Sequence, residues 1–422
     1  MFYSGSVLGK PATWFPYGEA GFKELREKER FYRDVTPYIA ELEQLGEKLV
    51  FFRPPRWGKT LFCRTLEQYY CVKGDRSLFE GLYMGKEENQ TAEMGKHLVL
   101  FLDFSIEVSG TALDVKKTLY DKINDSIITF NKRYKDVLET PVPIDENALR
   151  SFRYAKEAAD ASGYPLYVII DEYDRFANKL LVENRDTYDE MVSRKGDKGA
   201  KVDSVLRSVL ETLKEINPSR SFITGIMPLA MADASGYNVA KDVTHKKKIN
   251  DVMGLRKEDV TECLEALYGD DFSKVGEHLS LLEDHCNSHR MVAGGTPLFN
   301  PQLSYGYMEQ LADGENPGSE GLLDSNLQVS HNMFDLLLEN AKTPGLMDRL
   351  IAGEAIPMPR LQVRFGVREL LNSMNIESEE FVLSVMLSHG MVTWTEDTEN
   401  RSVVIPNKLV LTQFFDRLKR QM

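Results

Sequence analysis

The chain has 422 residues, of which 42% are hydrophobic and 28% are charged. At about 150 residues per domain, this length predicts two to three domains with sizeable buried cores. The net charge of −13 excludes a broad, nonspecific grip on nucleic acid or on an anionic membrane, although it is compatible with a local basic groove. The composition therefore predicts a folded, globular protein.

The cysteines and the apolar stretches bear on the cellular location. Four cysteines, at 63, 71, 263 and 286, have neither CxxC spacing nor the density of a disulfide-stapled secreted domain. No stretch approaches the roughly 18 consecutive apolar residues that span a bilayer. We expect an intracellular, cytoplasmic protein without membrane contact. The basic cluster at 245–248 is too short to assign, so a nuclear location stays open.

Apolar runs alternate with helical periodicity along the first 250 residues. One or two amphipathic helices are predicted at 22–45, and a polar surface segment at 185–201. Buried strands are predicted at 48–52, 97–104, 165–170 and 220–225, and helices at 60–73, 112–134, 146–162 and 202–216. This alternation predicts an α/β fold with a mainly parallel sheet that is covered on both faces.

The remainder of the chain is mostly helical. Helices are predicted at 257–268 and 274–286, a linker at 312–321, a β-hairpin at 391–405 and a final helix at 407–419. Helices with a hairpin indicate a winged-helix-like unit. We therefore divide the chain into a helical lead-in (1–45), a nucleotide-binding core (46–250), a helical extension (251–312) and a C-terminal winged-helix-like unit (322–422).

A phosphate-binding loop is predicted where the first strand passes into a helix, at Gly58-Lys59-Thr60. Backbone N–H groups at a helix start point at anionic oxygens, the lysine reaches the terminal phosphates, and the threonine hydroxyl ligates Mg²⁺. The general motif is GxxxxGK[ST], and Arg53 stands where its first glycine is expected. A chance Gly-Lys-Thr triplet is therefore the alternative.

Acidic and polar residues follow the other predicted strands. The strand at 165–170 runs directly into Asp171-Glu172, as in a Walker B motif, where Asp171 holds Mg²⁺ through water and Glu172 polarises the attacking water. A helix N-cap acid pair is the alternative. Thr224 either senses the γ-phosphate or caps its strand, and Asp103 has the same ambiguity. All four lie at the edge where parallel sheets bind ligands.

The segments FFRPPRWGKTLFCRTLEQYY, HLVLFLDFS, YVIIDEYD and FITGI together resemble the AAA-ATPase-like family, whose phosphate loop usually reads close to RPRRFGKT. FYRDVT at 31–36, SLFEGL at 77–82 and LFNPQLSYGYM at 298–308 resemble further segments of the family. The resemblance implies a P-loop NTPase fold of the additional-strand type, with ATP and Mg²⁺ as cofactors. It implies three sets of site residues: nucleotide binding by Arg53, Arg56, Trp57, Gly58, Lys59, Thr60 and Leu61, metal binding by Thr60 and Asp171, and catalysis by Lys59, Glu172 and Thr224.

The sequence also departs from the family pattern. Pro55 replaces an arginine, so Pro54 and Pro55 both lack an N–H donor. One lost hydrogen bond to a charged group weakens binding by about tenfold to a hundredfold, which Arg53 and Arg56 would offset by pairing with phosphate oxygens. Val35 stands where the family has lysine, and the proline that usually follows the motif YVIIDEYD is absent.

Known members commonly carry a PD-(D/E)XK nuclease-like domain, but residues 321–422 contain no convincing Asp and Glu-x-Lys pattern for it. We expect an ATP-binding, Mg²⁺-dependent ATPase that acts as a regulatory or motor module with a protein partner or further copies of itself. The alternatives are a non-hydrolysing nucleotide-binding scaffold, or the ATPase part of a nuclease-associated, nucleic-acid-processing system. Arg194, Arg207 and Arg220 are either arginine fingers or solvated surface residues, and the role of Asn238 is open.

Overall fold

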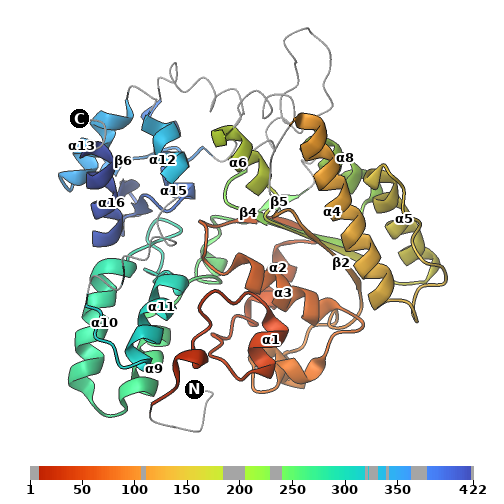
Figure 1. The fold of residues 1–422 in the computed structure, drawn as a ribbon, viewed down its shortest axis with the longest axis horizontal. Coiled ribbons are helices and arrows are strands. Elements are labelled where there is room, and N and C mark those ends of the chain that lie inside the picture. Colours follow the sequence, from red (N-terminus) through yellow and green to blue (C-terminus); the bar gives the residue numbers. More distant parts are fainter. Residues whose placement is uncertain are drawn as a thin grey trace.

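The computed structural model describes residues 9–105, 111–183, 205–228, 240–318, 322, 331–338, 342–362 and 378–419. Its centre is a five-stranded sheet in which all strand pairs are parallel (Figure 1). The strands, in the spatial order β2-β3-β4-β1-β5, are β1 Lys48–Phe52, β2 Leu98–Asp103, β3 Leu166–Asp171, β4 Arg220–Gly225 and β5 Lys241–Asp242. The four predicted strands are confirmed, and β5 adds an edge that was not predicted.

The position of β4 defines the type of sheet. It pairs with β1 on one side, Val50 opposite Ile223, and with β3 on the other, Ile169 opposite Phe222. The strand before the phosphate loop is thus separated from the Walker B strand by one added strand, as in the additional-strand type. All residues of β3 are buried, which explains why this strand forms a continuous apolar run instead of an alternating one.

Helices cover both faces of the sheet. Helix α3 (Lys59–Tyr70) packs against β2, β3 and β4, whereas α4 (Ala112–Arg133) packs against β2 and α5 (Ala148–Ala161), which in turn contacts α8 (Val205–Ile216). Figure 1 shows α3 on one side of the sheet and α4, α5 and α8 on the other. Right-handed crossovers require this, because the chain runs from β1 to β2 in one direction across the sheet and returns to β4 in the other. Helix α6 (Arg175–Glu183) follows β3.

The lead-in contains α1 (Phe22–Glu27) and α2 (Tyr38–Leu45), with the FYRDVT segment between them. Asp34 Oδ2 accepts a hydrogen bond from the Tyr83 amide at 2.6 Å, and Thr36 Oγ1 accepts one from the Met84 amide at 3.1 Å. The polar residues of FYRDVT therefore tie the lead-in to the chain that follows SLFEGL. One segment that resembles the family is thus bonded to the residues that directly follow another.

The helical extension consists of α9 (Lys257–Tyr268), α10 (Phe272–Cys286) and α11 (Pro301–Ala312). It shares a hydrophobic core with Trp14, Phe15 and Phe31 of the lead-in. An antiparallel bridge between Leu255 and Phe299 connects the two ends of this unit. The lead-in therefore packs partly with the extension, and the domain boundaries at 45, 250 and 312 stay predictions.

The C-terminal unit combines helices with a small antiparallel sheet of order β6-β8-β7. Its elements are α12 His331–Leu338, α13 Thr343–Ile351, β6 Ile356–Pro357, α15 Glu379–Ser388, β7 Thr393–Trp394, β8 Ser402–Val404 and α16 Lys408–Lys419. The pair β7-β8 is the predicted hairpin, and the arrangement is winged-helix-like. Helix α15 buries its middle, residues 381–386, and begins with Glu379 and Glu380.

The C-terminal unit contacts the phosphate loop directly. His289 Nε2 hydrogen-bonds the Gly390 carbonyl at 3.1 Å, and a Cβ placed on Gly390 would lie 3.4 Å from Pro54 Cβ and Cγ. The hairpin is joined to the extension by the Arg290 amide, which donates to Thr393 Oγ1 at 2.6 Å, and by an ion pair between Arg290 and Glu396. The loop after β1 is therefore packed against residues far along the chain.

The remaining helices are short. Single 3-10 turns lie at Ala12–Trp14, Arg76–Phe79, Tyr83–Gly85, Glu87–Asn89 and Lys247–Ile249. Within the described part of the chain, no helix has both the length and the apolar character needed to cross a membrane.

Candidate functional site

The phosphate loop runs from Arg53 at the end of β1 to Gly58 at the N-terminus of α3. Gly58 has φ = 91°, a left-handed conformation that side chains disfavour, although a Cβ there would meet nothing within 4 Å. The glycine is therefore required by its backbone conformation and not by lack of space. Arg56 also has a positive φ of 68°, which is uncommon for a residue with a side chain and typical of functional loops.

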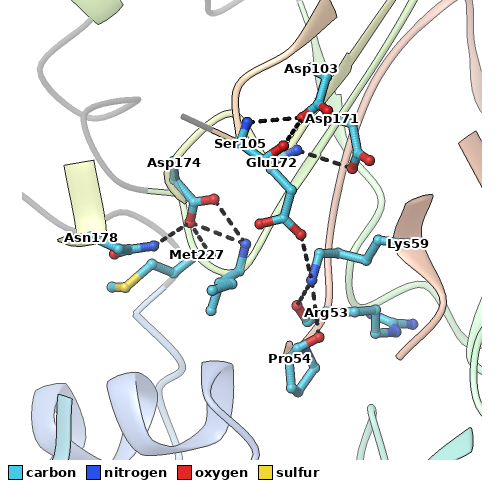
Figure 2. Close-up of polar contacts among 11 residues, drawn as sticks. Arg53, Pro54, Lys59, Asp103, Ser105, Asp171, Glu172, Asp174, Asn178 and Met227 are labelled. Atoms are coloured by element: carbon cyan, nitrogen blue, oxygen red, sulfur yellow. Dashed lines mark hydrogen bonds and ion pairs between the residues drawn. The ribbon is translucent and has the colours of Figure 1, made fainter. Parts of the chain in front are cut away.

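Lys59 is the first residue of α3, and its side chain is only 2% exposed. Its Nζ donates to the carbonyl oxygens of Arg53 at 3.3 Å and Pro54 at 3.1 Å and lies 3.5 Å from Glu172 Oε1 (Figure 2). The two residues predicted to serve the phosphates and the attacking water are thus an ion pair across the site. Pro54, which lacks an N–H group, contributes its carbonyl instead.

The Walker B residues lie at the end of β3, where Asp171 is buried. The Thr60 hydroxyl hydrogen-bonds the Asp171 carboxylate. Burial, reinforced by the Glu172 charge, raises the pKa of Asp171 to about 6. A hydroxyl and a carboxylate are hard oxygen donors and fit Mg²⁺, which binds through one or two carboxylates and takes its other ligands from water and phosphate.

Glu172 follows with φ = 54°, a second strained position of the site. Its amide donates to Asp171 Oδ1 at 3.0 Å, while its carboxylate reaches Lys59. Asp103 lies opposite Asp171 in the ladder between β2 and β3, and its Oδ1 accepts from the Ser105 amide at 2.8 Å. Carboxyl groups from two neighbouring strands therefore meet at one edge, as the sequence predicted.

Thr224 is the last residue but one of β4, on the same edge, and is completely buried. Among the described residues its Oγ1 has no hydrogen-bond partner. A buried hydroxyl without a partner costs about 1–3 kcal/mol, and such groups are rare in folded proteins. This unpaired donor is consistent with a ligand-sensing role and does not fit a strand cap, which would be bonded.

The Arg53 side chain does not point at the phosphate position. Its guanidinium donates to the carbonyl oxygens of Phe52 at 2.9 Å, Thr244 at 2.8 Å and Asn250 at 3.2 Å, and it stacks 4.1 Å from the Phe51 ring. Burial lowers the pKa of this group to about 9. The expected pairing of Arg53 with phosphate oxygens is therefore not supported. The guanidinium instead joins β1 to the chain beyond β5.

The other predicted nucleotide-binding residues have different surroundings. Arg56 is exposed at the mouth of a cavity, and Leu61 forms part of its wall. The Trp57 ring is buried edge-on against His289, with ring centroids 5.0 Å apart, and blocks any side chain at Gly254. Trp57 therefore also connects the phosphate loop to the helical extension.

The cavity has a volume of about 260 Å³ and extends from the phosphate loop to the lead-in and the extension. It is lined by Gly58, Lys59, Thr60 and Glu172, and on its far side by Arg33, Val35, Val252, Leu255, Gln302 and Tyr305. The far side was not predicted as part of the site. The sequence did carry a signal for it, because the FYRDVT and LFNPQLSYGYM segments resemble the family and both contribute residues to this wall.

The candidate arginine fingers are only partly described. Arg207 pairs with Glu211 at 2.6 Å, and Arg220 lies 3.6 Å from Glu93, so both have partners within the chain. Arg194 and Asn238 lie outside the described residues, as does the polar segment at 185–201.

The sheet order and this edge define a P-loop NTPase of the additional-strand type. The chain belongs to the family described as Predicted AAA-ATPase, whose model matches residues 16–235. The "Uncharacterized protein in vnfD 5'region" of Azotobacter chroococcum mcd 1 is 28% identical over 161 residues, which are 38% of this chain and 29% of the relative. The chain thus spans less than a third of that protein.

Two solved structures are similar over most of their length. The ORC2 protein of Aeropyrum pernix, determined as ADPNP-ADP complexes, has a TM-score of 0.38 and 11% identity over 94% of both chains. Cdc6p of Pyrobaculum aerophilum has a TM-score of 0.34 and 10% identity, over 92% of this chain and 96% of that chain. The family match and the strand order, not these neighbours, carry the assignment.

Proposed function

We propose that the protein binds ATP with Mg²⁺ and hydrolyses it to ADP and phosphate, as a regulatory or motor module. The observation that carries the proposal is the convergence of Lys59, Thr60, Asp171, Glu172 and Thr224 on one sheet edge. Three of them, Lys59, Thr60 and Glu172, also line the cavity. These residues come from the first turn of α3, from the end of β3 and the residue after it, and from the end of β4. A chance Gly-Lys-Thr triplet would not bring a carboxylate pair and an unpaired hydroxyl to the same place.

Each residue has a task in this proposal. The first-turn amides of α3 and Lys59 Nζ bind the phosphates, for which the lysine leaves its contact with Glu172. Thr60 and Asp171 would hold Mg²⁺, which neutralises phosphate charge when bound. Once released from Lys59, Glu172 orients the attacking water. Thr224 donates its hydrogen bond to the γ-phosphate.

The test compares the wild type with Lys59→Ala and Glu172→Gln. Ligand at a hundredfold excess over its Kd adds about 2.7 kcal/mol of stability, or about 3 °C in the midpoint of a chain of this length. We expect ATP with Mg²⁺ to raise the midpoint of the wild type and of Glu172→Gln but not of Lys59→Ala. Phosphate release should occur in the wild type alone. Equal, negligible shifts in all three proteins would refute the proposal.

The same experiment tests the scaffold alternative, and a nucleic-acid binding measurement tests the other. Binding without phosphate release, unchanged by Glu172→Gln, would indicate a non-hydrolysing scaffold. Participation in a nucleic-acid-processing system predicts salt-dependent DNA or RNA binding that responds to ATP. In the winged-helix-like unit, α15 is the helix directly before the β7-β8 hairpin. Its acidic start and buried middle do not favour nucleic acid as its partner, because a helix that reads a groove needs exposed, polar or basic side chains.

Oligomerisation, a protein partner and an intracellular location belong to the same proposal. The four cysteines are buried and unpaired, as expected in a reducing compartment. The oligomeric state with and without ATP, measured by light scattering, tests whether nucleotide drives assembly.

A further inference from the structure

A second buried carboxylate lies next to the Walker B pair, at Asp174. It is completely buried at the start of α6 (Figure 2). Its oxygens accept hydrogen bonds from the amides of Ile226 at 3.1 Å and Met227 at 2.8 Å, and from Asn178 Nδ2 at 3.0 Å. Two of these three donors belong to the turn that follows β4. Asp174 therefore connects the Walker B loop with the segment directly after Thr224.

Tyr173 adds two contacts between the same segments. Its amide donates to the Thr224 carbonyl at 3.1 Å, and its hydroxyl donates to the Met227 carbonyl at 2.8 Å. The ladder between β3 and β4 ends at the pair Ile170 and Ile223. The loop after β3 thus continues the connection beyond the sheet, up to and past the sensing position.

Gly225 makes this connection tight. A Cβ on Gly225 would lie 2.2 Å from Asp174 Oδ1 and 2.8 Å from Tyr173 Cδ1. The Gly225 carbonyl accepts a hydrogen bond at 3.1 Å from the amide of Arg53, which is the first residue of the phosphate loop. Three loops at this edge of the sheet are therefore held to one another near Asp174.

The arrangement has a consequence for the Thr224 hydroxyl. A hydroxyl can distinguish a third phosphate from its absence only if its position is held within a few tenths of an ångström. The ladder with β1 continues to Gly225, but the ladder with β3 ends one residue before Thr224, so on that side the position of Thr224 depends on the loop after β3 and the turn that it holds. That turn is held by a charged acceptor, which makes stronger hydrogen bonds than a neutral one.

We propose that Asp174 is a positioning residue that holds Thr224 in place and so lets the protein distinguish ATP from ADP. This inference rests on the proposed nucleotide binding. It does not require hydrolysis, because it concerns the relative affinities for two ligands.

The experiment measures the Kd of a non-hydrolysable ATP analogue and of ADP, both with Mg²⁺, by calorimetry on the full chain. Asp174→Asn replaces one oxygen by an NH₂ group that faces a backbone N–H, and it removes the charge. The quantity of interest is the Kd of ADP divided by the Kd of the ATP analogue. We expect this ratio to fall about tenfold, the size of one hydrogen bond to a charged group, because the analogue binds more weakly while ADP binding is little changed. Thr224→Val should lower the ratio similarly.

Asn178→Ala is the matched control, because it removes a hydrogen bond to the same carboxylate from α6 and leaves the β4 turn untouched. Asn178→Ala and Asp174→Asn should both lower the thermal midpoint, but of these two only Asp174→Asn should change the ratio of the Kd values. Tyr173→Phe, which keeps its ring, provides a second reading if Asp174→Asn does not fold; its ratio should fall about threefold.

The outcomes separate this inference from the proposed function. A wild type that favours the ATP analogue, with Asp174→Asn or Tyr173→Phe favouring it equally, overturns the inference alone. A wild type that binds both nucleotides equally also overturns this inference, but it agrees with the proposed nucleotide binding. A wild type that binds neither nucleotide refutes both. A ratio that falls by the same factor in Asn178→Ala would show only general loosening and also overturns the inference.

Discussion

Gly225→Ala adds one methyl group at the place where the three loops meet. The new Cβ would lie 2.2 Å from Asp174 Oδ1 and 2.8 Å from the Tyr173 ring, both well inside van der Waals contact. A clash with the end of a flexible side chain is usually relieved by a small rotation. Here both neighbours are completely buried, and the carboxylate is held by several donors, so a rotation breaks hydrogen bonds.

The size of the effect follows from those hydrogen bonds. Each one between a charged group and an amide contributes about 1.5–3 kcal/mol, so displacing Asp174 from the amides of Ile226 and Met227 costs about 3–6 kcal/mol. Gly225 does not have a positive φ, so backbone strain adds nothing for alanine. A loss of this size is a large part of the typical 5–15 kcal/mol free energy of unfolding.

Urea unfolding measures this loss, with Gly276→Ala as the control. Gly276 lies inside α10, and a Cβ placed on it would meet nothing within 4 Å, so alanine should stabilise the protein by up to about 1 kcal/mol. The same chemical change should thus have opposite signs at the two sites. A free energy of unfolding for Gly225→Ala within about 0.5 kcal/mol of wild type would refute the described packing.

Further outcomes follow from other buried groups. Thr224→Val should raise the free energy of unfolding of the nucleotide-free protein in urea by about 1–3 kcal/mol, because it removes a hydroxyl without a partner among the described residues; a lower free energy of unfolding would show that the hydroxyl is bonded. Asp259→Ala should cost about 3–5 kcal/mol, because it leaves the Arg33 guanidinium, 3.0 Å away, buried without its carboxylate; a loss below about 1 kcal/mol would contradict the burial. Burial raises the pKa of Asp174 from 3.8 to about 6, so its contribution is present below pH 4 and is lost as the pH rises through 6. Wild type should therefore lose about 3 kcal/mol more than Asp174→Asn between pH 4 and 7.5, and equal losses in calorimetry would contradict the shift.

The sequence allowed the sheet and the reactive edge to be predicted because both depend on local patterns. Continuous apolar runs marked the four long strands. Asp171 and Thr224 lie at the ends of two of them, and Lys59 begins the helix that follows a third. Strand β5 carries no such pattern: Lys241 and Asp242 are polar, exposed and form an edge of only two residues.

The direction of the Arg53 side chain could not be predicted. Its hydrogen-bond acceptors at 244 and 250 are carbonyl groups nearly two hundred residues away, and any residue type supplies a carbonyl. The cavity wall formed by Arg33 and Tyr305 was hidden for a similar reason, since it depends on how the lead-in packs against the extension. Asp174 was visible as part of a motif, but its acceptor role depends on the turn after β4.

The contact of Pro54 with Gly390 links two equilibria. Pro54 also supplies a carbonyl to Lys59, so a phosphate that draws the lysine away acts on the same residue that packs against the C-terminal unit. If nucleotide changes the equilibrium constant of this docking by some factor, docking changes nucleotide affinity by the same factor, because coupling between sites is reciprocal. With such coupling, a molecule that binds or displaces the winged-helix-like unit would change nucleotide affinity without having to reach the cavity.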